Sequence, residues 1–402
     1  MPPNQVTKHA QQDSVASHYA LVVLLLAYIL SFIDRNVLSL LVGPIREAFN
    51  ISDFQFSLLH GLAFTLFYIF LGLPIGWLAD RISRKKIIIS GVFFWSIMTC
   101  LCGYAKNFAS LFAARIGVGV GEATLSPAAY SLLSDAYSAK NLKWATSIFA
   151  MGITIGSGTS YIVGGWLYDL FTRYNYSNLP LIGHMEAWQL TFVAVGMPGL
   201  LVVALLLWIS EPERLHHKIS VDRADNEALP IKQVARFVFT EWRAYGSIMF
   251  SVSMMAIVGY GTLIWYPEFL VRTYQMSKSE AGGALGTIFI FAGTAGTFSG
   301  AWFSAYLHRL GFTDANMRVV LIAATLCCIP ATAAPLMNSS YWALTLATLV
   351  IFIHYTHFGV AMAALQNITP NRMRAQVSAL LLFVANFFGL ALGGSIVASL
   401  TD

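Results

Sequence analysis

The stretch YALVVLLLAYILSFIDRNVLSLL, residues 19–41, predicts a membrane-spanning helix. It is long enough to cross the roughly 30 Å hydrocarbon core of a bilayer, which takes about 20 apolar residues in a helix. The whole chain shares this character, since 57% of its residues are hydrophobic and only 11% are charged, whereas soluble domains carry about 25% charged residues. The composition therefore predicts an all-α membrane protein whose outer surface faces lipid.

Ten further apolar runs predict eleven membrane helices in total. Together with the first, they cover approximately residues 19–41, 54–79, 86–105, 108–136, 142–171, 187–210, 245–271, 281–306, 319–336, 341–365 and 377–400. The predicted organisation is a cytoplasmic tail (1–18), a six-helix bundle (19–210), a charged cytoplasmic linker (211–243) and a second bundle with helices seven to eleven (244–402). Within the linker, residues 229–238 alternate apolar and basic, which fits either an interfacial helix or a solvated segment.

The basic residues predict the orientation. Of the 24 lysines and arginines, 17 lie in predicted inside segments, five lie in outside segments, and Arg35 and Arg115 lie within helices. Cytoplasmic loops of membrane proteins carry the excess of Lys and Arg. We therefore expect a multi-pass protein of the cell (inner) membrane with a cytoplasmic N-terminus.

Two acids and two bases lie deep in predicted helices, namely Asp34 and Arg35 in the first helix and Arg115 and Glu122 in the fourth. Each costs at least about 2.5–3.5 kcal/mol to insert into a bilayer. At 1.5 Å per residue, Asp34 lies about 18 Å and Glu122 about 21 Å from the same side of the membrane. We therefore expect the four side chains to meet, either as static salt bridges or as a proton-coupling and substrate-charge relay.

Aromatic and histidine side chains are candidates to line a substrate cavity, although such residues more often pack in a core. His354 and His357 lie one turn apart in the tenth predicted helix and favour a cavity wall or a packing contact over a metal site, which would need further ligands. His60 is interpreted as a packed or cavity-edge histidine. The full set of cavity candidates is Tyr28, Tyr130, Tyr161, Tyr260, Trp265, His354 and His357.

The segment GWLADRISRKK, residues 76–86, joins the second and third predicted helices. It resembles the signature loop of the major facilitator superfamily, which has a glycine, an Asp-Arg pair and a basic pair. The resemblance implies a cytoplasmic gate in which Asp80 sits against the N-terminal end of the eleventh helix, near residues 374–376. A carboxylate is stabilised at such a positive helix end. The gate residues implied are Gly76, Asp80, Arg81, Arg84 and Lys85.

Further motifs resemble the spinster-like branch of that superfamily, whose members include lysophospholipid and sphingosine-phosphate transporters. They are FIDRN at 32–36, RIGVGVGEA at 115–123, GSGTSY at 156–161 and SEPER at 210–214. The resemblance implies two pseudo-symmetric helix bundles, alternating access, and Asp34, Arg115 and Glu122 at the centre of the cavity. It also implies protons as the coupling ion, no cofactor, and an amphiphilic, lipid-like or anionic substrate.

Several alternatives stay open. An organic anion (sugar acid or carboxylate):proton symporter also shows an Asp-Arg pair in its first helix and a Glu-Ala pair in its fourth. The chain departs from the superfamily in lacking a twelfth helix and the Gly-Pro of the antiporter signature, so the direction of transport is not predicted. A membrane enzyme would need a metal or nucleophile constellation, and an open channel would not need paired buried charges. We expect a monomer that contacts membrane lipids, with no nucleic-acid partner.

Glycines recur in the fifth and eighth predicted helices, among them Gly158, Gly165, Gly282 and Gly286. Small residues four apart let two helices approach closely. The spacing predicts tight packing on these faces.

Overall fold

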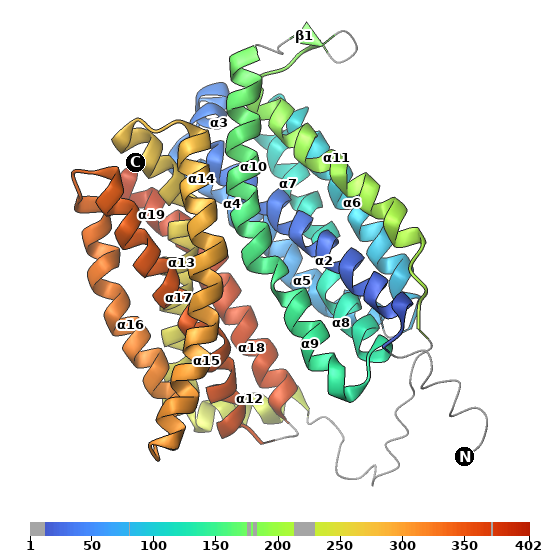
Figure 1. Cartoon of the computed structure of the whole chain (residues 1–402), viewed down its shortest axis with the longest axis vertical. Coiled ribbons are helices and arrows are strands. Elements are labelled where there is room, and N and C mark those ends of the chain that lie inside the picture. The colour runs from blue at the N-terminus through green and yellow to red at the C-terminus, as the bar shows by residue number, and fades with distance from the viewer. Residues whose placement is uncertain (1–12, 80, 175–177, 180–182, 213–229, 371–372) are drawn as a thin grey trace. The chain divides into compact units, whose positions relative to one another are not determined.

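Helices make up nearly all of the computed structural model, which describes residues 13–402 except 80, 175–177, 180–182, 213–229 and 371–372 (Figure 1). Ten helical stretches of this described part are long and apolar enough to span a membrane. The predicted run at 54–79 corresponds to two consecutive helices, α4 (Asp53–His60) and α5 (Leu62–Ala79), which are not among those ten. The all-α membrane class is confirmed.

The first part of the chain contains α2 (Val15–Asn36), α3 (Val42–Phe49), α4, α5, α6 (Arg84–Gly103), α7 (Phe108–Glu122), α8 (Leu125–Ala136), α9 (Ala139–Ala150), α10 (Gly152–Tyr174), strands β1 (Asn178–Leu179) and β2 (Gly183–His184), and α11 (Ala187–Leu207). The second part contains α12 (Ile231–Thr240), α13 (Trp242–Tyr274), α14 (Lys278–Ile288), α15 (Thr294–Arg309), α16 (Ala315–Ala333), α17 (Ser340–Ile368), α18 (Arg374–Asn386) and α19 (Gly394–Thr401).

Contacts group the chain into two compact units. Unit 1 comprises Met1–Leu215, Pro267–Thr287 and Ala398–Asp402, and unit 2 comprises His216–Tyr266 and Ile288–Val397. Unit 1 thus holds all the helices before the linker together with the end of α13, nearly all of α14 and the last residues of α19. The predicted boundaries 19–210 and 244–402 remain a prediction, because they divide the chain by sequence order alone.

Within unit 1, glycines bring α10 and α14 into close contact, and Figure 1 shows the two helices side by side. A Cβ atom added to Gly282 would lie 2.2 Å from the carbonyl oxygen of Tyr161, and one added to Gly286 would lie 2.4 Å from that of Gly158. At Gly165 the added atom would meet the carbonyl oxygen of Lys278 at 2.3 Å. Tight packing on these faces is therefore confirmed, and backbone meets backbone there.

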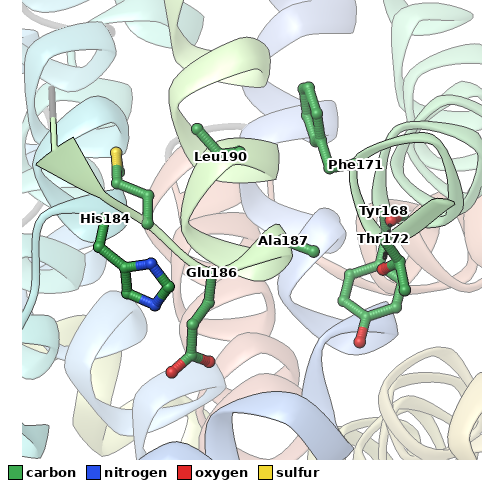
Figure 2. Close-up of a pocket in the computed structure, with 8 residues that line it drawn as sticks. Tyr168, Phe171, Thr172, His184, Glu186, Ala187 and Leu190 are labelled. Atoms are coloured by element: carbon green, nitrogen blue, oxygen red, sulfur yellow. Dashed lines mark hydrogen bonds between the residues drawn. The ribbon is translucent and has the colours of Figure 1, made fainter. Parts of the chain in front are cut away.

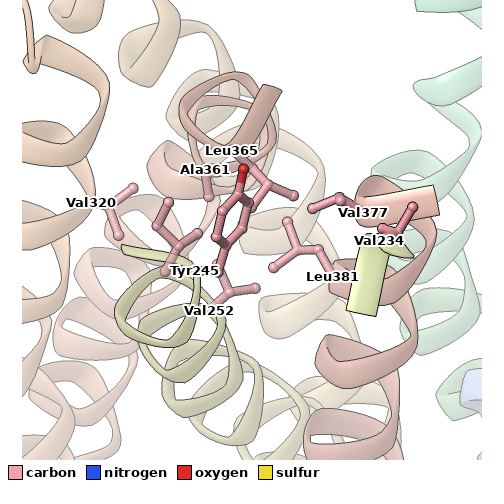
Figure 3. Close-up of a cluster of buried hydrophobic side chains, with 9 residues drawn as sticks. Val234, Tyr245, Val252, Val320, Ala361, Leu365, Val377 and Leu381 are labelled. Carbon is pink, nitrogen blue, oxygen red and sulfur yellow. The ribbon is translucent and has the colours of Figure 1, made fainter. Parts of the chain in front are cut away.

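A core of nine buried side chains organises unit 2, and Figure 3 shows how they converge from five helices. They are Val234 of α12, Tyr245, Ile248 and Val252 of α13, Val320 of α16, Ala361 and Leu365 of α17, and Val377 and Leu381 of α18. Tyr245 donates its hydroxyl hydrogen to the Ile368 carbonyl at 3.2 Å. Within the alternating pattern, residues 231–238 therefore belong to helix α12, and Val234 anchors this helix to the unit 2 core.

Large apolar side chains are also exposed along the long helices. Leu201 of α11 is 70% exposed, Phe250 of α13 is 65% exposed and Leu321 of α16 is 67% exposed. Water would penalise such surface by roughly 25 cal/mol per Å². A lipid environment removes this penalty, as the composition predicts.

Candidate transport site

A buried ion pair joins the first and fourth predicted membrane helices. The Arg35 guanidinium of α2 donates from Nη2 to Glu122 Oε2 of α7 at 2.6 Å and from Nε to the same oxygen at 3.2 Å. Their side chains are only 7% and 1% exposed. The rings of Phe32, Phe64 and Tyr68 lie 4.7, 4.3 and 5.0 Å from the Arg35 Cζ atom, so the cation is held among aromatic faces.

Arg115 of α7 binds backbone rather than a carboxylate. Its Nη1 and Nη2 atoms donate to the carbonyl oxygens of Asp34 and Arg35 at 3.0 and 3.3 Å. These carbonyls belong to the last turn of α2, where an α-helix leaves its acceptors unsatisfied and carries partial negative charge. Ser160 of α10 donates to the neighbouring Ile33 carbonyl at 3.0 Å. Hydrogen bonds from Arg115 and Ser160 to its carbonyls therefore hold the C-terminal end of α2, which carries Asp34 and Arg35, in place.

Asp34, Arg115 and Glu122 each have one buried polar atom without a hydrogen-bond partner among the described residues, namely Oδ1, Nε and Oε1. Asp34 is 1% exposed. Trp95 and Thr99 of α6 lie beside the carboxylate, and Arg115 and Glu122 are its charged neighbours. A buried polar atom without a partner costs about 1–3 kcal/mol. Asp34 is therefore poised to gain from binding a proton or a further polar group.

The prediction that the four charged side chains meet is confirmed in geometry. All four are buried in unit 1, but one carboxylate–guanidinium ion pair forms instead of two, because Arg115 turns to the α2 carbonyls. Neutralising Glu122 with a proton would release Arg35 from its partner. Proton binding at Glu122 can thus be coupled to a movement of α2 relative to α7.

Two of the three predicted cavity tyrosines of unit 1 share one aromatic stack. Tyr28 of α2 stacks on Phe149 of α9 with ring centroids 4.4 Å apart, and Tyr130 of α8 meets the same ring edge-on at 5.1 Å. Tyr28 is buried while Tyr130 is 40% exposed. Tyr161 of α10 is fully buried, and its backbone carbonyl faces Gly282 of α14. Their proposed contact with substrate stays a prediction.

The four candidates of unit 2 divide into two pairs. Tyr260 and Trp265 of α13 donate to Asn386 Oδ1 at 3.5 Å and to the Gly394 carbonyl at 2.8 Å, respectively. The rings of His354 and His357 lie 5.0 Å apart on α17, and His357 Nδ1 hydrogen-bonds to the His354 carbonyl. All four side chains thus make these contacts within unit 2.

The predicted gate loop forms a buried network around Arg84, the first residue of α6. Its side chain is 1% exposed and pairs with Asp135 of α8 and with Glu211, which follows α11. Glu211 also accepts from Ser83 and, at 2.8 Å, from the backbone N–H of Arg84. This network holds α6, α8 and the end of α11 together.

Three other gate residues lie in the described part of the chain. Lys85 donates to the Leu207 carbonyl at 2.8 Å, Gly76 lies within α5, and Arg81 is exposed. Asp80 lies outside the described residues. The predicted latch between Asp80 and residues 374–376 therefore stays a prediction.

A second buried charge cluster was missed by sequence analysis. Asp53, the first residue of α4, accepts from Arg46 at 2.9 Å and from both terminal nitrogens of Arg272 at 2.9 and 3.0 Å. Arg272 also donates to Glu268 at 2.8 Å, and Lys278 lies 3.6 Å from the other Glu268 oxygen. We call these five residues the Asp53 cluster.

Asp34 and Glu122 are therefore not the sole buried acids of unit 1 among the described residues. Asp53 and Glu268 are 2% and 5% exposed, so they are as buried as Asp34 and Glu122. Both fall near the ends of predicted helices, where solvent-exposed charges are ordinary, and nothing in their spacing distinguishes them. The cluster is extended by Asp402, whose carboxylate accepts from the backbone N–H groups of Asp53 and Phe54 at 2.8 Å each.

One pocket of about 320 Å³ lies elsewhere in unit 1, between α10, β2 and the start of α11 (Figure 2). It is lined by Tyr168, Phe171, Thr172, His184, Met185, Glu186, Ala187 and Leu190. None of the predicted cavity residues belongs to it. The buried charges of α2 and α7 therefore remain the candidate site.

Residues 24–394 match the profile of the family described as Major Facilitator Superfamily. The chain belongs to the major facilitator superfamily. It is accordingly a multi-pass integral membrane transporter and not an enzyme, and the two-bundle fold implied by the sequence motifs is that of its family.

Curated relatives of this transporter include several kinds. An "MFS-type efflux pump" of Mycolicibacterium smegmatis is 24% identical over 98% of this chain and 87% of the relative. A "Probable L-galactonate transporter" of Escherichia coli is 24% identical over 88% of this chain and 77% of the relative. "Protein spinster homolog 1" of Xenopus laevis is 30% identical over 65% of this chain, which spans about half (48%) of that relative.

Among solved structures, a bacterial homologue of the human lysosomal transporter Spinster is 30% identical and covers 96% of this chain and 83% of its own. Its inward-facing, unoccupied form superposes with a TM-score of 0.84, and its inward-facing, occupied form with 0.80. A D-xylose–proton symporter shares the fold at 16% identity and a TM-score of 0.68. The resemblance to spinster-like transporters is thus confirmed over nearly the whole chain.

Proposed function

We propose that this transporter uses a proton to drive an amphiphilic, lipid-like or anionic small molecule across the membrane by alternating access. The observation that carries the proposal is the buried Arg35–Glu122 ion pair beside Asp34, whose Oδ1 atom has no partner among the described residues. Intramembrane ionisable residues are expensive and mark ion and substrate pathways. Two carboxylates and two guanidinium groups supply a site for a proton and a site for a negative head group.

In this mechanism Glu122 in its charged form holds Arg35, and α2 stays fixed against α7. A proton on Glu122 removes the charge that Arg35 pairs with, and the guanidinium then binds an anionic group of the substrate instead. Arg115 keeps the end of α2 in place through the Asp34 and Arg35 carbonyls while this exchange occurs. Proton binding and substrate binding are thereby linked through one cation.

The lipid-like substrate class is supported by the spinster relatives and by the aromatic surroundings of Arg35. A second candidate, an organic anion:proton symporter for sugar acids or carboxylates, is supported by the relation to the probable L-galactonate transporter. We further propose an inner-membrane monomer with a cytoplasmic N-terminus, because 17 of the 24 lysines and arginines fall on one predicted side.

The test uses purified protein in liposomes, with oleoyl lysophosphatidylglycerol and L-galactonate as the two transported probes. Wild-type uptake of one probe should rise with an inward proton gradient. Asp34→Asn and Glu122→Gln should lower that pH-driven uptake at least tenfold while remaining monodisperse. Asp314→Asn is the matched control, since Asp314 forms only an exposed pair with Arg318. Unchanged pH dependence in both cluster variants would refute the coupling role, and the preferred probe distinguishes the two substrate classes.

A further inference from the structure

His60, the last residue of α4, is a buried titratable group that the mechanism above does not use. It is fully buried, and neither ring nitrogen has a hydrogen-bond partner among the described residues. Buried polar groups in folded proteins are almost always satisfied, so each exception calls for a water, an ion or a function. A simple packing role would be filled better by an apolar side chain of the same size.

The helix geometry aims His60 at the charge cluster. Helices α4 and α5 continue across Gly61, whose N–H donates to the Ser57 carbonyl at 2.8 Å and whose carbonyl accepts from Thr65 at 2.9 Å. His60, Phe64 and Tyr68 are therefore spaced by one turn each and share one face. The rings of Phe64 and Tyr68 both lie against Arg35. His60 occupies the next position along that face.

The packing of α5 on α7 identifies its neighbour. A Cβ atom added to Gly119 would lie 2.6 Å from the Phe64 carbonyl oxygen, so these two positions face each other. Helix α4 packs on α7, and α5, which follows α4, packs on both α7 and the following α8. The pair α4–α5 therefore runs in the same direction as the pair α7–α8. One turn earlier on each helix, His60 therefore faces Arg115, whose Cζ atom lies 5.9 Å from the Phe64 ring.

The charged groups around His60 come from few elements. Arg115 of α7 and Arg35 of α2 are the cations that face it. Helix α3 contributes Arg46, which binds Asp53 at the opposite end of α4, about 10 Å away at 1.5 Å per residue. On the shared face of α5 the titratable group is Tyr68. His60 thus lies between the Asp53 cluster and the Arg35–Glu122 pair.

We propose that His60 is a third proton-carrying residue of this transporter and passes protons to the carboxylates of Asp34 and Glu122. The inference rests on the proposed proton coupling and names a residue on its route. A neutral imidazole has one nitrogen that accepts a proton and one that donates, so it relays protons in either direction. One ring nitrogen binds the incoming proton, the other releases a proton to a carboxylate through water, and the ring is neutral before and after.

The two guanidinium groups determine which residue holds the proton at rest. A proton that stays on His60 places a third positive charge beside Arg35 and Arg115, and like charges repel strongly in a medium of low dielectric constant. A proton on Glu122 or Asp34 removes a negative charge instead of adding a positive one. The carboxylates are therefore the resting place of the proton, and His60 is occupied only in transit.

The test compares two activities of His60→Gln in liposomes, with oleoyl lysophosphatidylglycerol and L-galactonate as probes. One is net uptake driven by a proton gradient. The other is exchange of labelled for unlabelled probe at equal pH, which moves no net proton. We expect net uptake to fall at least tenfold with a flattened pH profile, and exchange to fall by less than threefold. Exposed His308 provides the matched control His308→Gln, which should change neither.

Each outcome separates this inference from the proposed function. Wild-type net uptake without pH dependence defeats the proposed function itself. A pH-dependent wild type together with wild-type behaviour in His60→Gln overturns the role of His60 and leaves the proposed function standing. Equal loss of uptake and exchange in a monodisperse His60→Gln protein also overturns it, because the residue would then be structural. His60→Asn is the second variant, with the same expectations, if His60→Gln does not fold.

Discussion

The Arg35 guanidinium shows how one residue combines binding and packing. Its fork contacts Glu122 with two nitrogens, while its plane lies among the rings of Phe32, Phe64 and Tyr68. A lysine ammonium is a point charge that does neither with the same geometry. Position 35 therefore requires a planar guanidinium group as well as a positive charge.

Arg35→Lys should accordingly lower transport of the preferred probe at least tenfold, although the formal charge is kept. The reason is that a single ammonium loses the fork and the stacking against three rings. Uptake in liposomes and the melting midpoint in detergent measure the two effects, with the exposed Arg318→Lys as control. Wild-type uptake by Arg35→Lys would show that a positive charge suffices.

At this scale the sequence predicted which charges meet but not how. Counting residues from the helix ends placed Asp34 and Glu122 at similar depths, with Arg35 and Arg115 in the same two helices, and the cost of burying charge favoured their meeting. The choice of the α2 carbonyls as partners for Arg115 depends on where α2 ends, and a helix end is uncertain by one or two residues. The surroundings of His60 and Asp34 likewise depend on side-chain packing between helices, which hydropathy does not predict.

Elements are held together in unit 1 by glycine contacts and by charged loops. The approach of α14 to α10 leaves no room for a side chain at Gly282, whereas a Cβ atom at Gly283 would meet nothing within 4 Å. The two neighbouring glycines therefore provide an internally controlled test of close helix packing.

Gly282→Ala should destabilise the protein by about 1–3 kcal/mol, because the new atom overlaps a backbone carbonyl that cannot move aside. Gly283→Ala should be neutral or stabilise by up to about 1 kcal/mol, because alanine favours the helix. Melting midpoints of the two variants in detergent give the comparison. Equal midpoints would contradict the close approach of α10 and α14.

Glu211 makes the loop network sensitive to acid. Burial raises the pKa of Glu211, but the hydrogen bonds from Ser83 and from Arg84 outweigh this effect and hold its pKa below the ordinary value of 4.5. A lowered pKa means that the contact contributes fully above pH 4.5 and is lost as the pH falls through the lower folded-state pKa.

Glu211→Gln should therefore lower stability by about 1–2 kcal/mol at pH 7, the scale of a lost charged hydrogen bond. The difference from wild type should shrink as the pH falls from 4.5 through the lower folded-state pKa, since wild-type Glu211 takes up a proton over this range. Melting midpoints between pH 7 and about pH 3 measure this. A difference that does not vary with pH would contradict the charged contact.

The elements themselves were well predicted from hydropathy, because a bilayer imposes helix length directly. Interruptions of regular helix geometry were not predicted. They fall at Gly61 between α4 and α5, where the backbone hydrogen bonds still continue, and at residues 123–124 between α7 and α8, without any gap in hydrophobicity. The Arg84–Asp135–Glu211 network was also unforeseen as a contact, because its members lie far apart in sequence and meet only through packing.

The whole molecule depends on contacts that join distant parts of the chain. The Asp53 cluster ties the segment 267–287 to α3 and α4 inside unit 1, and Asp402 ties the segment 398–402 to the same place. The Arg272 side chain is 39% exposed and the Asp53 side chain only 3%, so their ion pair is partly shielded from water. Breaking such a pair leaves a charge without compensation.

Asp53→Asn should lower the free energy of unfolding by about 1–3 kcal/mol, which is reduced from the fully buried case because Arg272 reaches solvent. It should also raise hydrogen exchange in residues 267–287, which lose their anchor. Asp314→Asn, which breaks an exposed pair, should cost less than about 1 kcal/mol. Similar effects of the two substitutions would show that the Asp53 cluster is an ordinary surface contact.

We propose that a proton on the buried carboxylates drives transport. The most direct measurement of this coupling is the proton movement that accompanies transport, followed with a pH-sensitive dye inside liposomes after a gradient of the preferred probe is imposed. We predict that the wild type moves protons together with the probe and that Glu122→Gln does not. Saturable transport by the wild type without any proton movement would contradict this coupling.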